Sequence, residues 1–114
     1  MNQRTHYQMI ISCADMQYET AKAFLAKKLG AQFAGATFSR IDGAWSSQGS
    51  EDRSLYQDIM VEPGIKVDCS TLPDQNGEVM LQEAAAELKA ATKMDFIWVH
   101  IESWSVSAHH IALE

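Results

Sequence analysis

HYQMIISCADMQYETAKAFLAKKLG, residues 6–30, changes its hydrophobic period once, and the whole fold follows from that change. Every second residue from Tyr7 to Cys13 is apolar, which predicts a strand with one buried side. From residue 15 onward the apolar side chains recur at helical spacing, which predicts an amphipathic helix over 15–30. We expect the Asp15 carboxylate to cap the first turn of this helix and Gly30 to end it.

The rest of the chain supplies three more strands and one more helix. Strands are predicted at 35–43, 54–62 and 95–106, and an alanine-rich helix is predicted at 78–93. Pro63 and Gly64 are expected to close the third strand, because proline cannot donate to a ladder and glycine tolerates a turn. Residues 65–77 are expected to form a loop, in which IKVDC adds at most a strand residue or two.

The order strand, helix, strand, strand, helix, strand contains two β-α-β units, and each must cross over right-handedly. Interleaving the units gives the ferredoxin-like split β-α-β arrangement, an α+β fold. Its four-stranded antiparallel sheet carries both helices on one face and leaves the other face open. A length of 114 residues is that of a single domain over 1–114.

The composition excludes several classes of function. The chain has 15 acidic and 9 basic residues and therefore a net charge of −6, which argues against binding nucleic acid through its phosphates. No apolar run approaches the roughly 18 to 20 residues of a membrane span, and the first residues lack a signal-peptide pattern. Cys13 and Cys69 fit no metal-binding spacing, so we expect reduced thiols in a soluble cytoplasmic protein with no metal and no cofactor.

The open face of the sheet is the surface most suited to a function. Ile97, Val99 and Ile101 of the last strand are aliphatic and are expected to face the helices. An exposed aromatic patch on the opposite side usually marks a partner surface. Assembly into a homo-oligomer, coverage by residues 105–114 and a ligand site are the three interpretations of that patch. The residues expected on the open face are Phe96, Trp98, His100, Glu102 and Trp104 of the last strand, Ser54, Tyr56, Asp58, Met60 and Glu62 of the third, and His6, Gln8, Ile10 and Ser12 of the first.

Three titratable residues of this face suit acid–base chemistry. His100 titrates near neutral pH, and Glu102 and Asp58 are carboxylates that would orient or assist it. In the split β-α-β order, however, the first strand lies between the third and fourth, which separates Asp58 from the other two. Solvated or interface-bonded side chains are the alternative interpretation of the trio. The adjacent His109 and His110 are expected to lie in a solvated tail.

The hairpin between the second and third strands, GATFSRIDGAWSSQGSEDRSLYQDIMVE, carries a tryptophan in its loop. A positive φ at Gly43 would turn the chain and pack Trp45 against the sheet edge as a structural pin. Alternatively, the hairpin reaches a neighbouring subunit or covers a ligand. Arg40, Arg53 and Tyr56 would then supply contacts to anions and rings beside Trp45.

The same hairpin resembles one found in a group of small uncharacterised proteins from bacterial, phage and mobile-element genomes, with the pattern GATxxxxxGxW…ExS. The matching residues here are Gly35, Ala36, Thr37, Gly43, Trp45, Glu51 and Ser54. The extra SSQG and the EDRS spacing make the loop longer than in that pattern. The resemblance implies the ferredoxin-like arrangement and carries no activity. The hairpin is more distantly similar to that of the trimeric divalent-cation-tolerance proteins, another ferredoxin-like family.

Three functions are therefore open. The first is a homo-oligomeric binding module, most simply a dimer, that uses Trp98, Trp104, Tyr56 and Met60 toward a partner or small molecule. The second is a small cofactor-free enzyme of the dimeric ferredoxin-like kind, a monooxygenase or isomerase, with a His/carboxylate pocket. The third is an acidic inhibitor of a basic host protein, which requires one continuous acidic face.

Overall fold

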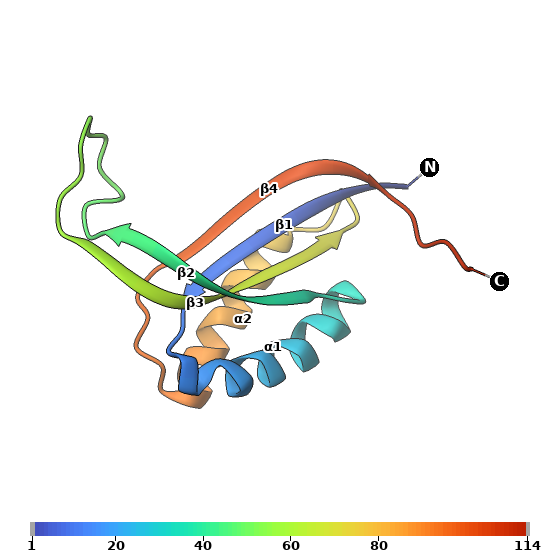
Figure 1. The fold of residues 1–114 in the computed structure, drawn as a ribbon. Coiled ribbons are helices and arrows are strands. Elements are labelled where there is room, and N and C mark those ends of the chain that lie inside the picture. The colour runs from blue at the N-terminus through green and yellow to red at the C-terminus, as the bar shows by residue number, and fades with distance from the viewer. Residues whose placement is uncertain (1, 114) are drawn as a thin grey trace.

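A computed structural model describes residues 2–113 and has the predicted ferredoxin-like α+β fold (Figure 1). The four strands form one antiparallel sheet in the order β2-β3-β1-β4. Both helices lie against one face of this sheet, and the other face has no helix over it. Within the described residues, no helix is long and apolar enough to cross a membrane. The elements are β1 (Asn2–Ser12), the 3-10 turn η1 (Asp15–Gln17), α1 (Tyr18–Phe33), β2 (Thr37–Ser46), β3 (Ile59–Thr71), α2 (Gly77–Thr92) and β4 (Val99–Ala108).

The core lies between the sheet and the helices, as the alternation in β1 predicts. Met9 and Ile11 of β1 are fully buried, and so are Ile65 and Val67 of the neighbouring β3. Side chains of this size stabilise the fold by about 1.5–3 kcal/mol each when they leave water. The helices contribute Ala21, Leu25 and Leu29 from α1 and Leu81, Ala84 and Leu88 from α2.

The first helix begins later and ends later than predicted. Asp15 starts a 3-10 turn, and the cap residue of α1 is Gln17, which makes no side-chain capping bond. Gly30 does not end α1, because the helix continues to Phe33, which is buried. Ala34 takes the left-handed conformation there, with φ of 63°. Burial of the Phe33 ring therefore stabilises a further turn of α1, although Gly30 alone predicts that the helix ends before it. The second helix agrees with the prediction to within one residue, and the Asn76 side chain caps it.

The third strand is where the prediction was wrong. β3 does not close at Pro63 and Gly64 but runs through them to Thr71, so the expected loop 65–77 is mostly strand. The Pro63 carbonyl accepts a hydrogen bond from the Cys13 amide, just where β1 leaves the sheet. In antiparallel strands the N–H and C=O of one residue point to the same side. The missing proline N–H thus faces a position where the ladder is already ending, and little pairing is lost.

The other strands are also shifted relative to the prediction. β1 starts earlier than residue 6, because its first residues pair with the end of β4, Asn2 with Ala108. β2 extends three residues beyond Gly43, to Ser46. β4 begins only at Val99, so residues 95–98 connect α2 to it without regular structure.

Part of the β2–β3 hairpin extends beyond the rest of the sheet. β1 ends opposite Gly64, whereas β3 continues back to Ile59 with β2 as its partner on one side. We call residues 42–63 the arm: the end of β2, the connecting loop and the start of β3. In Figure 1 the loop of the arm stands clear of the sheet, on the side away from the helices.

Candidate functional site

A groove lies on the open face at the end of the sheet where the arm begins. Its volume is about 600 Å³. Ile10 and Ser12 of β1 line its floor, the arm forms one wall, and residues 95–98 with the start of β4 form the other. The side chains around it include Ile10, Met60, Glu62, Trp45, Trp98 and His100.

The pairing register explains why this groove exists. Ser12 pairs with Gly64 of β3, and Ile11 pairs with Val99 of β4. A longer β1 would therefore continue between residues 60–63 on one side and residues 96–98 on the other. The chain instead turns away at Ala14 into η1. The groove takes the position in the sheet that a longer central strand would fill.

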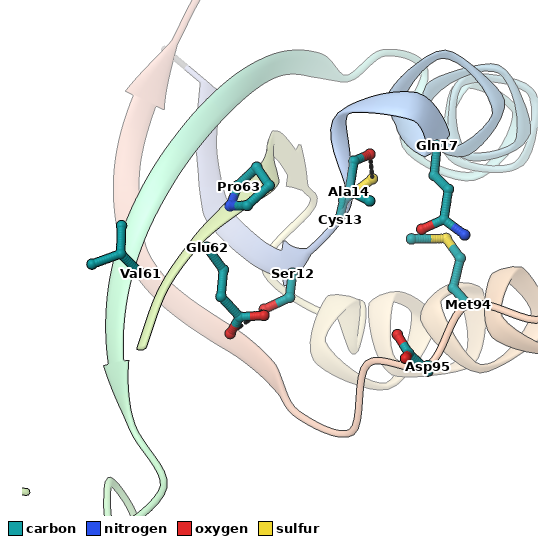
Figure 2. Close-up of a pocket in the computed structure, with 9 residues that line it drawn as sticks. All are labelled: Ser12, Cys13, Ala14, Gln17, Val61, Glu62, Pro63, Met94 and Asp95. Atoms are coloured by element: carbon teal, nitrogen blue, oxygen red, sulfur yellow. Dashed lines mark hydrogen bonds between the residues drawn. The ribbon is translucent and has the colours of Figure 1, made fainter. Parts of the chain in front are cut away.

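A smaller cavity of about 200 Å³ adjoins the groove and shares Ser12, Glu62 and Asp95 with it (Figure 2). The Ser12 hydroxyl donates a hydrogen bond of 3.4 Å to the Glu62 carboxylate, and Figure 2 shows these two side chains pointing toward each other. Cys13 lies behind them, buried, with its thiol 3.6 Å from the Ala14 carbonyl oxygen. Burial raises the pKa of the Cys13 thiol, an effect that the Arg40 guanidinium partly offsets. The cavity thus presents carboxylates to a ligand and keeps its thiol protonated at neutral pH.

Trp45 is held by a glycine, but not through the expected turn. Gly43 has no positive φ, and among the described residues no glycine does. Trp45 and Gly43 lie on the same side of β2, and a Cβ on Gly43 would come within 2.5 Å of the indole ring. The indole therefore lies along its own strand in space that only glycine leaves free. Trp45 is half-buried there and forms part of the groove wall.

The structure brings together two of the three predicted catalytic residues. His100 Nε2 lies 3.0 Å from Glu102 Oε1, on the open side of β4, and His100 borders the groove. Asp58 does not join them, because it lies in the arm loop, with φ of 56°, and not in a strand of the sheet. Within the described residues, no three His, Cys, Asp or Glu side chains converge in a way that could hold a metal ion.

A second polar cluster lies further along the open face and was not predicted. His6 Nε2 lies 3.0 Å from Asp68 Oδ1, and the His6 ring packs on Trp104 with centroids 4.7 Å apart. Arg4 donates to the hydroxyl of Ser70 at 2.8 Å. Sequence reasoning placed His6 and Trp104 on this face but missed Asp68, which was assigned to a loop. The alternation of Ile65, Val67 and Cys69 was the signal that could have identified the strand.

The two tryptophans predicted on the open side differ in their surroundings. Trp104 lies on β4 with 44% of its surface exposed, packed on His6, whereas Trp98 precedes β4, borders the groove and is 73% exposed. Phe96 was expected on the open face but is buried in the core, and Ile97 was expected under the helices but is exposed. Because β4 starts only at Val99, the strand alternation does not hold for these residues. Val99 and Ile101 do pack against the core as predicted.

The remaining predicted contacts lie away from the groove. Arg40 points to the helix side, where its guanidinium lies 4.1 Å from the Tyr18 ring centre and 3.5 Å from Asp15. Arg53 pairs with Glu51 inside the arm loop, and the Tyr56 hydroxyl donates to the Glu51 carbonyl oxygen. Tyr56 and Ser54 thus belong to the arm loop and not to a strand face. Met60 and Glu62 occupy the open face as predicted, opposite Trp45 and Gly43.

The C-terminal tail does not cover the open face. Residues 109–113 have no regular structure and run past the end of the sheet (Figure 1). His109 and His110 are exposed, as predicted, and Ile111 and Leu113 are exposed as well. Coverage of the aromatic patch by its own tail is therefore wrong for the described residues.

Comparison with known proteins finds solved structures with a similar fold. The sequence matches no protein-family model and no curated protein. A phage SAM lyase in complex with S-methyl-5'-thioadenosine is similar in structure, with a TM-score of 0.54 and 15% identity over 95% of this chain and 92% of that chain. The phage SAM lyase in its apo state gives 0.55 and 14% over the same shares. The C-terminal domain of the MgtC protein from Mycobacterium tuberculosis gives 0.51 and 12%, covering 88% of this chain and 87% of that chain. At these identities the similarity shows a shared fold alone.

Proposed function

We propose that this chain is a homo-oligomeric binding module in which a second copy covers the arm, while the groove beside the arm receives a small ligand. The observation that carries this proposal is the exposed apolar surface of the arm. Val61 is 77% exposed, Ile59 57% and Met60 53%, although all three belong to a strand.

The arm is poorly supported by its own chain. Ile59 and Val61 lie on the helix side of β3, yet their exposure shows that the helices do not reach them. A two-stranded hairpin without a packed face is marginally stable in water. Between Ile59 and Glu62, β3 pairs with β2 and with no strand on its other side, within the part of the chain that the structure describes. Such edges and contiguous apolar patches favour association with another chain.

A second copy suits this surface better than a different protein of opposite charge would. Each chain carries a net charge of −6, so an interface between copies must avoid charged side chains. Ile59 and Val61, which share the helix side of the arm, meet that requirement. An isologous contact needs one self-complementary patch, and this uncharged patch can serve both partners. A dimer is the simplest assembly.

Light scattering tests the assembly. We expect the wild-type chain at high micromolar concentration to have the mass of a dimer or a larger closed oligomer. Val61→Lys should shift it toward the monomer, because a lysine ammonium in the interface would lose its hydration. The matched control is Val79→Lys on α2, where valine is 43% exposed and outside the proposed interface. A wild-type chain that stays monomeric at these concentrations would exclude the proposal.

An enzyme is the second candidate, supported by the His100–Glu102 pair at the edge of the groove. A carboxylate 3.0 Å from the imidazole can orient the ring, and a positioned histidine is the side chain that general acid–base catalysis uses most often. The fold is shared with a phage SAM lyase, so SAM is the first substrate to test. We expect release of S-methyl-5'-thioadenosine, detected by chromatography, to fall about 100-fold or more in His100→Gln. No release above a protein-free blank would remove SAM cleavage as a candidate.

The acidic inhibitor is not proposed. It requires one continuous acidic surface, but the open face mixes both signs. Arg4 and Lys66 lie on the same face as Asp68 and Glu102, by the register of β1, β3 and β4.

A further inference from the structure

We infer that the groove binds an organic cation that carries an aromatic or other apolar group. This inference rests on the proposed ligand-binding role of the groove and adds the chemistry of the ligand. It does not depend on the oligomeric state, which is measured separately.

The groove has the size and shape of a small-molecule site. Its volume of about 600 Å³ lies within the roughly 300–1,000 Å³ of typical ligand pockets. The adjoining cavity of about 200 Å³ extends it toward the Glu62 carboxylate. Ile10 and Ser12 on its floor belong to β1, which pairs with a strand on each side, so this part of the site is built on a rigid element.

The charges in the groove favour a cation. Glu62 and Asp95 line both the groove and the adjoining cavity. Among the residues that line the groove there is no lysine or arginine, and its one histidine, His100, already faces the Glu102 carboxylate. The Ser12 hydroxyl donates to Glu62 and fixes its position without neutralising it. An anionic ligand would meet uncompensated carboxylates here, whereas a cation would offset them.

The aromatic side chains of the groove indicate which kind of cation it binds. Trp45 stands on the arm side and Trp98 on the opposite side, so the groove has an indole in each wall. The face of an indole attracts a cation more strongly than the other aromatic rings do. Both rings also offer apolar area to the rest of a ligand, and Met60, which pairs with Trp45 in the arm, adds a polarisable contact. A small, strongly hydrated metal ion would use neither indole, so the structure favours an organic cation.

Three small molecules that share a phenyl ring and differ in charge test this assignment. Benzyltrimethylammonium is the cation, benzyl alcohol the neutral analogue and benzoate the anion. We expect isothermal calorimetry and tryptophan fluorescence to give at least tenfold tighter binding for the cation than for either analogue. Glu62→Gln and Trp98→Leu should each weaken binding of the cation at least fivefold. Glu83→Gln, an exposed carboxylate on α2, and Trp104→Leu, outside the groove, are the matched controls and should leave it unchanged.

The outcomes separate this inference from the proposed assembly. Equal binding of all three probes, or tighter binding of benzoate, would overturn the cation assignment even if the chain is a dimer. If binding is selective for the cation but Glu62→Gln and Glu83→Gln weaken it equally, the cation assignment is also overturned, because the selectivity then comes from the net charge of the chain alone. Selective binding by a strictly monomeric chain would uphold the inference and refute only the proposed assembly.

Discussion

Single glycines in this protein serve packing and not backbone strain. Gly43 leaves room for the Trp45 ring and Gly77 leaves room for the Tyr7 ring, whereas a Cβ added at Gly30 would meet no heavy atom within 4 Å. The Gly77 amide also donates to the Tyr7 hydroxyl at 3.2 Å. Since none of these glycines has a positive φ, the cost of replacing each depends on the space around it.

Gly77→Ala and Gly30→Ala should therefore have opposite effects on stability. The added methyl group at Gly77 meets the buried Tyr7 ring, and overpacking of this kind costs about 1–3 kcal/mol. The same change at Gly30, inside α1, removes a poor helix former and should stabilise by about 0.5–1 kcal/mol. Urea unfolding monitored by circular dichroism measures both. Equal midpoints for the two variants would contradict this account of the glycines.

The buried Cys69 thiol makes stability depend on pH at the alkaline end. Burial raises the pKa of Cys69 from 9.0 to about 12, and the adjacent Asp68 carboxylate adds to the effect. The folded state therefore holds the thiol proton more tightly than the unfolded state, a contribution present in full below pH 9 and lost as the pH rises toward 12. Thermal melts at pH 8 and pH 10.5 should show a smaller loss of stability for Cys69→Ala than for the wild type. Parallel losses would assign the pH dependence to other groups.

At the scale of elements, β3 is the strand that organises the molecule. Its second half, Ile65–Thr71, pairs with β1 throughout and with β2 as far as Asp68, and it alternates buried with half-buried residues. Its first half belongs to the arm and has β2 alone beside it. One strand thus supplies both the centre of the sheet and one side of the groove.

This division predicts two levels of amide protection within β3. In hydrogen exchange, residues 65–71 should be protected close to the global stability, and residues 59–62 should exchange faster. If a second copy covers the arm, Val61→Lys should speed exchange at residues 59–62 and leave residues 65–71 unchanged. Mass spectrometry of peptides from the two halves measures this. Uniform protection along β3 in the Val61→Lys variant would show that the arm is stable by itself.

For the whole molecule, the net charge of −6 opposes assembly and the uncharged patch on the arm favours it. Salt screens the repulsion between like-charged chains and leaves apolar burial intact. Association should therefore strengthen as NaCl rises from about 50 mM to 500 mM, where the Debye length falls well below 10 Å. Sedimentation velocity across this range provides the measurement. Weaker association at high salt would mean that ion pairs, not apolar contacts, join the copies.

Local patterns in the chain are enough to establish the order of the elements, and with it the topology. Alternation in residues 7–13 and helical periodicity in 78–93 are signals between near neighbours, and right-handed crossovers leave few ways to combine them. The same local signals placed Met60, Glu62, His100 and Trp104 on the open face.

Where the strands stop relative to one another is set by long-range packing, and the groove depends on it. Ser12 lies opposite Gly64 because two strands more than fifty residues apart settle into one register, which depends on packing of their buried sides and not on neighbouring residues. The same long-range packing buries Phe33 beyond Gly30 and Phe96 ahead of β4. Trp45 and Trp98 therefore border one groove because β1 ends at Ser12 and does not continue beside the arm, a fact that no local pattern in the sequence contains.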